Sequence, residues 1–182
     1  VTLEVGYNVS DAWMPAFAQS MVDWRGSEVL DLVWAKGGTA PRRCRPTAGR
    51  IEVCSEAYGA TGWLGVAQIW VSGSHITQAT TKVNDSYFSQ GPYDSDEWRQ
   101  FVMCQEIGHA FGLDHQDEDF DNENLGSCMD YTNDPFDNQH PNAHDFEQLD
   151  DIYSHLDIVS GGGGGGGRGR GAAPQLPPAV SG

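Results

Sequence analysis

A short stretch near the middle of the chain carries side chains that bind metals, at the spacing of a helix. Gln105 and His109 are four residues apart, so they share one face of a helix, and Glu106 lies beside that face. Gly112 follows three residues after His109, where a helix commonly ends in a left-handed residue. A turn at that point would bring His115 back towards His109. Two imidazoles with a third ligand suit zinc, and a neighbouring carboxylate suits proton transfer.

The same stretch resembles the extended zinc-binding motif of the metzincin metalloproteases. That motif has two His four residues apart with a Glu between them, a Gly three residues on, and a third His. The chain matches it at Glu106, His109, Gly112 and His115 and departs at the first position, where Gln105 stands in place of His. The glutamine oxygen is a neutral and weaker donor than imidazole. Either Gln105 is an oxygen ligand of a working site, or the metal is lost and the domain is a binding module.

A second stretch supports the resemblance. This stretch runs from Ser127 to Tyr131 and reads Ser-Cys-Met-Asp-Tyr. Its methionine, Met129, lies fourteen residues after His115. It is similar to the Met-turn of astacins and serralysins, which places a Met beneath the metal and a Tyr near it. The resemblance implies that Met129 lies under the site and that Tyr131 binds either the zinc or the reacting oxyanion.

The resemblance also implies a reaction. Zinc would be held by Gln105, His109 and His115. Glu106 would take a proton from water and pass it to the leaving amine, and Tyr131 would donate to the oxyanion. The expected activity is that of a secreted, matrixin-like zinc metalloendopeptidase acting on an extended protein or peptide. The sequence does not indicate which peptide.

Hydrophobic periodicity predicts the elements that must position these residues. The pattern indicates an α+β domain. The expected strands are 1–9, 29–35, 50–55, 63–72 and 75–83, and the expected helices are 12–24, a long helix from 94 towards 112, and 141–155. This order fits the fold that the resemblance implies, a twisted mixed sheet packed on two long helices, with a small C-terminal subdomain that contains the Met-turn and the final helix.

The last two strands have a particular role in this interpretation. The strand at 75–83 alternates and is rich in Thr, which is typical of an edge strand. The resemblance implies that this pair of strands borders the cleft, where an extended substrate adds as a further strand. We expect a catalytic domain over residues 1–158 and a Gly- and Pro-rich linker or tail over residues 159–182.

The four cysteines form an even set without a Cys-x-x-Cys pair, which favours two disulfides and therefore an oxidising, extracellular compartment. A bridge between Cys44 and Cys54 would staple the loop at 36–50 to the strand after it. A bridge between Cys104 and Cys128 would clamp the metal helix to the Met-turn, two segments that adjoin in the fold that the resemblance implies. Four buried thiols are the alternative.

The net charge of −16 argues against nucleic acid and anionic membranes as partners, and no apolar run reaches membrane-spanning length. A monomer is expected. Every formally charged side chain between Asp114 and Asp157 is Asp or Glu. Asp117, Asp119 and Asp121 alternate like the opening of a calcium loop. A calcium site and a hydrated loop are both open interpretations of this segment.

Overall fold

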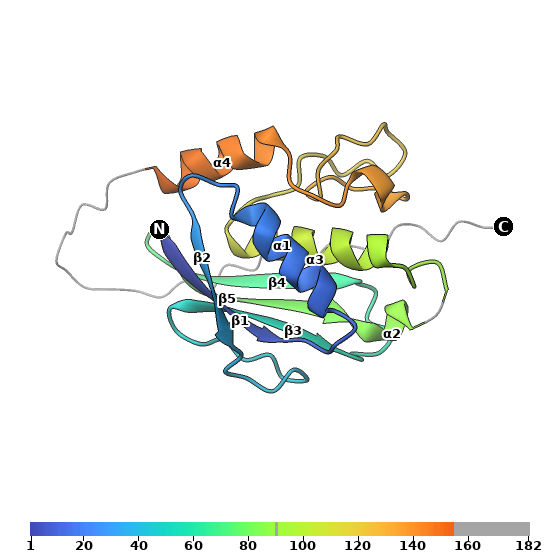
Figure 1. Cartoon of the computed structure of the whole chain (residues 1–182), viewed down its shortest axis with the longest axis horizontal. Coiled ribbons are helices and arrows are strands. Elements are labelled where there is room, and N and C mark those ends of the chain that lie inside the picture. The colour runs from blue at the N-terminus through green and yellow to red at the C-terminus, as the bar shows by residue number, and fades with distance from the viewer. Residues whose placement is uncertain (90, 155–182) are drawn as a thin grey trace.

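The computed structural model describes residues 1–89 and 91–154 and arranges them as a five-stranded mixed β-sheet with helices α1 and α3 on the same face (Figure 1). The strand order is β2-β1-β3-β5-β4. Strand β1 pairs in parallel with β2 and β3, β3 pairs in parallel with β5, and only β4 runs antiparallel, against β5. The strands are β1 Thr2–Asn8, β2 Asp31–Lys36, β3 Arg50–Glu56, β4 Gly65–Ser72 and β5 His75–Asn84. The expected α+β class is confirmed.

Four α-helices and one 3₁₀ turn accompany the sheet in the described part of the chain. They are α1 Met14–Trp24, α2 Asp85–Phe88, α3 Asp96–Ala110, the 3₁₀ turn Pro135–Asp137 and α4 Ala143–Tyr153. The long helix α3 begins where the Ser95 side chain accepts a hydrogen bond from the Trp98 amide. Helix α4 lies beyond α1 and α3 on the side away from the sheet (Figure 1). The short helix α2 and the 3₁₀ turn were not expected from the sequence.

The prediction that the strand at 75–83 is an edge strand is wrong. Strand β5 lies inside the sheet, between β3 and β4, and β4 is the edge. The threonines that suggested an edge are interior residues, because Thr80 and Thr81 are buried. Threonine is β-branched and small enough for a buried strand when its hydroxyl is bonded. The Thr81 hydroxyl meets that need by donating to the backbone oxygen of Glu106 in α3.

The core lies between the sheet and the two helices on it. The stripe predicted on α1 is fully buried, because Trp13, Phe17, Met21 and Trp24 are all 0% exposed. Helix α3 contributes a second set of buried apolar side chains, Trp98, Phe101, Val102 and Ile107. Both sets were expected from their helical spacing. None of the described helices is both long enough and apolar enough to cross a membrane.

Two disulfides cross-link the domain, Cys44–Cys54 and Cys104–Cys128, and these are the expected pairs. The first fixes the loop before β3 to that strand. The second joins α3 to the segment after the acidic loop. Helix α4 ends at Tyr153, whereas its expected end at His155 and the tail expected over residues 159–182 lie outside the described residues. The proposed domain boundary therefore stays a prediction.

Helix α4 should depend on the capping residue Asn142. Its side chain accepts hydrogen bonds from the amides of His144 and Asp145, and the Asp145 carboxylate bonds back to the Asn142 amide. We expect Asn142→Ala to lower the free energy of unfolding by about 1–2 kcal/mol, because this capping box is lost. Urea denaturation measures the change. The exposed change Glu147→Ala on the same helix is the control, and equal effects of the two variants would contradict the prediction.

Candidate metal centre

Helix α3 ends in a turn that brings the two histidines of the site together. Gly112 has a φ of +98°, and the amides of Gly112 and Leu113 bond back to the carbonyls of His109 and Gly108. This is a Schellman motif, which requires a left-handed residue and therefore favours glycine. After the turn, the Nε2 atoms of His109 and His115 lie 2.9 Å apart. The sequence predicted both the glycine turn and the meeting of these rings.

Hydrogen bonding fixes the protonation of His109. Its Nδ1 lies 2.9 Å from the Leu113 carbonyl oxygen, which can only accept, so Nδ1 carries the proton and Nε2 presents a lone pair. Burial lowers the pKa of His109, and burial together with the neighbouring His109 lowers the pKa of His115 to about 4. Both rings are therefore neutral at pH 7. Two nitrogens bound to one tetrahedral zinc lie about 3.3 Å apart, so a small opening of this pair would suit a metal.

The carboxylate of Glu106 lies inside the protein without a partner. The residue is 0% exposed, and neither carboxylate oxygen has a hydrogen-bond partner among the described residues. Burial raises the pKa of Glu106 well above its usual value. The side chain reaches strand β4 because Gly65 makes room for it: a Cβ at that position would lie 2.5 Å from Glu106 Oε1. A buried carboxylate without a partner is costly, so this arrangement fits a group that acts on water or substrate.

Gln105 is held by its amide nitrogen. The residue is 4% exposed, and Nε2 donates to the backbone oxygen of Cys128 at 2.9 Å. An amide has its oxygen and nitrogen on opposite branches, so this bond turns Oε1 away from Cys128. Gln105 also lines the same pocket as Glu106 and Tyr131. Within residues 1–89 and 91–154, no group of three or more His, Cys, Asp or Glu side chains is arranged to hold a metal ion.

Met129 packs directly beneath the metal helix. It is 0% exposed, and its sulfur lies so close to Gly108 that a Cβ there would be 2.5 Å from it. The turn that carries Met129 is fixed by the Ser127 hydroxyl, which accepts from the Met129 amide and donates to Asp145. The methionine therefore supports helix α3 one residue before His109, and its position beneath a metal stays a prediction.

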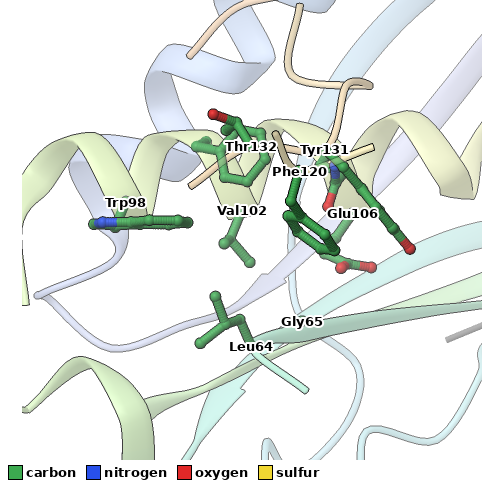
Figure 2. A pocket seen from close by; sticks show the side chains of 10 residues that line it. Leu64, Gly65, Trp98, Val102, Glu106, Phe120, Tyr131 and Thr132 are labelled. Carbon is green, nitrogen blue, oxygen red and sulfur yellow. The ribbon is translucent and has the colours of Figure 1, made fainter. Parts of the chain in front are cut away.

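Tyr131 stands beside the histidines. Its ring centroid is 4.3 Å from that of His115 and 4.7 Å from that of Phe120, on which it stacks with an interplanar angle of 20°. Figure 2 shows the two aromatic rings side by side next to the Glu106 carboxylate, with Leu64 and Val102 facing each other across the pocket. Sequence analysis did not identify Phe120, Leu64 or Val102 as site residues. Phe120 is the one aromatic residue between His115 and Tyr131, and this isolated position was the signal that the sequence offered.

The calcium site considered for the acidic loop is not supported. The carboxylate of Asp117 accepts the backbone amide of Asp119, and that of Asp119 accepts the amide of Asp121. Each side chain thus closes a local turn with the backbone two residues on. The described part of the loop contains no cluster of acidic groups around a common point.

No protein-family model and no curated protein sequence matches the chain. Among solved structures, myroilysin is similar over 86% of this chain and 94% of its own, with 14% identity and a TM-score of 0.48. The high choriolytic enzyme HCE-1, a hatching enzyme zinc-protease from the medaka fish Oryzias latipes, is similar over 85% of this chain and 90% of its own, with 10% identity and a TM-score of 0.42. Similarity at these values is too distant to assign the chain to a family.

The buried Glu106 should make the metal-free protein less stable as the pH rises. Above pH 4.5 the unfolded chain releases this proton, whereas the folded protein retains it to a higher pH. Stability from this group is therefore lost as the pH increases above 4.5. Since glutamine does not ionise, we expect Glu106→Gln to gain stability over the wild type by up to about 1.4 kcal/mol per pH unit.

Urea unfolding of both proteins in chelator, between about pH 5 and pH 8, measures this difference. The exposed change Glu123→Gln serves as the control, because it removes the same charge outside the site. Parallel stability profiles for the wild type and Glu106→Gln would contradict the assignment of a buried, partner-free carboxylate.

Proposed function

We propose that the domain is a secreted zinc-dependent metalloendopeptidase in which Glu106 is the general base. The observation that carries the proposal is the juxtaposition of this unpaired, fully buried carboxylate with a histidine pair whose Nε2 atoms are 2.9 Å apart. The unpaired carboxylate has a free-energy cost within the protein alone, whereas the two neutral imidazoles share a hydrogen bond between their Nε2 atoms. An ion would replace that hydrogen bond and take a lone pair from each ring, and water beside the ion would give the carboxylate a partner.

The residues that would hold the ion are His109, His115 and Gln105. Two neutral imidazoles and one amide oxygen form a donor set that zinc accepts, although the oxygen weakens the site relative to a third imidazole. Zinc in such a site acts as a Lewis acid and lowers the pKa of water towards neutrality. The bond from Gln105 to the Cys128 carbonyl fixes the amide in one orientation, so the oxygen needs little ordering on binding.

Glu106 is suited to move the proton. Its raised pKa brings the carboxyl group closer to neutral pH, where a group most effectively accepts a proton and then returns it. The apolar walls of the pocket, Leu64 and Val102, keep this carboxylate poorly solvated. We infer that Glu106 accepts a proton from the attacking water and delivers it to the amine that leaves.

We propose that Tyr131 assists at the carbonyl oxygen of the substrate. Stacking on Phe120 and contact with His115 restrict its ring, so the phenol needs little reorganisation to donate a hydrogen bond. A donor fixed in advance stabilises the negative charge that develops in the transition state. The role that we propose for Tyr131 is therefore that of an oxyanion donor.

The substrate would bind as an extended peptide along β4. This strand is the edge of the sheet next to β5, and its first residue, Gly65, lies against Glu106. A peptide that adds to this edge through backbone hydrogen bonds passes the carboxylate. We further infer from the two disulfides that the protein is secreted. We also propose that it acts as a monomer.

The amide at position 105 also favours a second candidate function. If Gln105 does not hold the ion, the domain keeps the architecture of the site without its activity and acts as a peptide-binding module. This alternative predicts neither stoichiometric zinc nor cleavage of a denatured protein in zinc-supplemented buffer.

We expect Glu106→Gln to reduce cleavage of a casein-type substrate by roughly 10²- to 10⁴-fold, because the general base is lost. Zinc content, determined by elemental analysis, should be unchanged, since the glutamine is close to the same size and is not a ligand. Glu123→Gln is again the control for loss of charge. Cleavage at the wild-type rate by Glu106→Gln would refute the mechanism.

The ligand role of Gln105 is tested by Gln105→His. An imidazole is a stronger ligand for zinc than an amide oxygen, so zinc affinity should rise by at least roughly tenfold. Competition with a chromophoric chelator measures the affinity independently of activity. Gln148→His, which adds an imidazole at an exposed position of α4, is the control. An unchanged affinity would show that residue 105 does not face the ion.

A further inference from the structure

A second hollow lies on the far side of the turn that ends α3. It has a volume of about 410 Å³ and is bounded by the β4–β5 hairpin, the start of β1, the last turn of α3 and the end of α4. Two apolar residues that line it, Ile51 and Ala110, are buried. The other apolar side chains that form the lining of its interior are only partly buried, and these are Leu3, Ile69, Val71, Ile76, Ile152 and Tyr153. We call this hollow the hairpin groove.

The described chain ends at the rim of the hairpin groove. Ile152 and Tyr153 are the last residues of α4 and line the groove themselves. The Tyr153 hydroxyl donates to the Phe111 carbonyl at 2.8 Å, which fixes the end of α4 against the end of α3. The last described residue, Ser154, therefore directly follows a helix end that is fixed next to the apolar lining.

The sequence beyond that point is apolar over a short length only. Residues 155–159 read His-Leu-Asp-Ile-Val, and seven glycines begin two residues later. Leu156 and Ile158 are two residues apart, so they share one face if the segment is extended. Five extended residues span up to about 17 Å. The tether is so short that the local concentration of the segment is high.

We propose that residues 155–159 dock into the hairpin groove of their own chain, with Leu156 and Ile158 facing its apolar lining. The three apolar side chains in this segment would then be buried where they leave α4, and the glycines after them would begin outside the domain. The catalytic domain would end at the last docked residue. This assignment does not depend on the proposed function.

The docked segment would brace the turn at Gly112 from behind. Ala110 and Gly112 form part of the groove, and a Cβ added at Gly112 would lie 3.1 Å from Ile76 Cδ1. Ile76 therefore lines the hairpin groove and also packs against the Schellman turn before His115. Docking would hold the hairpin on that turn.

The test uses the full chain with the double change Leu156→Asp and Ile158→Asp. We expect the melting temperature to fall by about 5 °C or more, because two apolar contacts are replaced by charges that cannot be buried. The fluorescence of a dye that binds apolar surfaces should increase as the groove is uncovered. The control is Leu176→Asp with Val180→Asp, which places the same charges in the Pro-containing tail. Unchanged melting and dye binding in the first variant would overturn the proposal.

A double-mutant cycle identifies the contact. Val71→Asp alone, on the edge strand, should lower the melting temperature. The double variant Val71→Asp with Ile158→Asp should lower the melting temperature by less than the sum of the two single effects, because both changes remove the same contact. Additive effects would overturn docking in this groove. A change from dimer to monomer in Ile158→Asp, seen by light scattering, would instead assign the groove to a second copy and overturn docking within one chain.

Discussion

The burial of helix α3 on nearly every side is the constraint on which the rest of the structure depends. This helix carries a glutamine, a glutamate and a glycine at consecutive or nearly consecutive positions that are all buried. Each is accommodated by a different device. The amide of Gln105 bonds to the Cys128 carbonyl, Glu106 extends over Gly65, and Gly108 leaves space for Met129. Burying the Glu106 carboxylate without a hydrogen-bond partner costs free energy, so the packing of the rest of the helix must offset this cost.

Cys128 connects the C-terminal segment to this helix in three ways. Its sulfur is bonded to Cys104, its carbonyl accepts the Gln105 amide, and its own amide donates to the His140 carbonyl. The disulfide therefore does more than restrict the unfolded chain, because it fixes the carbonyl that orients the side chain at position 105. The geometry of the candidate metal centre and the oxidation state of the protein are linked at this residue.

Local spacing predicted one part of the site, whereas the contact of the segment around Cys128 and Met129 with α3 was expected only from the resemblance. His109, Gly112 and His115 follow from helix geometry and from the conformational preference of glycine. The contact of Glu106 with Gly65 could not be predicted, because it joins segments 41 residues apart and depends on the register of α3 over the sheet. The threonine-rich strand was misplaced for the same reason. The residue types in a segment predict that it forms a strand, but they do not predict which strands lie beside it in the sheet.

The same distinction between near and distant contacts has a consequence for how the domain folds. The histidine pair is closed by a six-residue segment and a glycine turn, so forming it costs little chain entropy. The environment of Glu106 requires β4, and the orientation of Gln105 requires the Cys128 segment. The two halves of the centre therefore differ in contact order, and the imidazole pair can assemble before the sheet is complete. Metal capture by the nascent pair would then select, among partly folded chains, those in which α3 has already ended at Gly112.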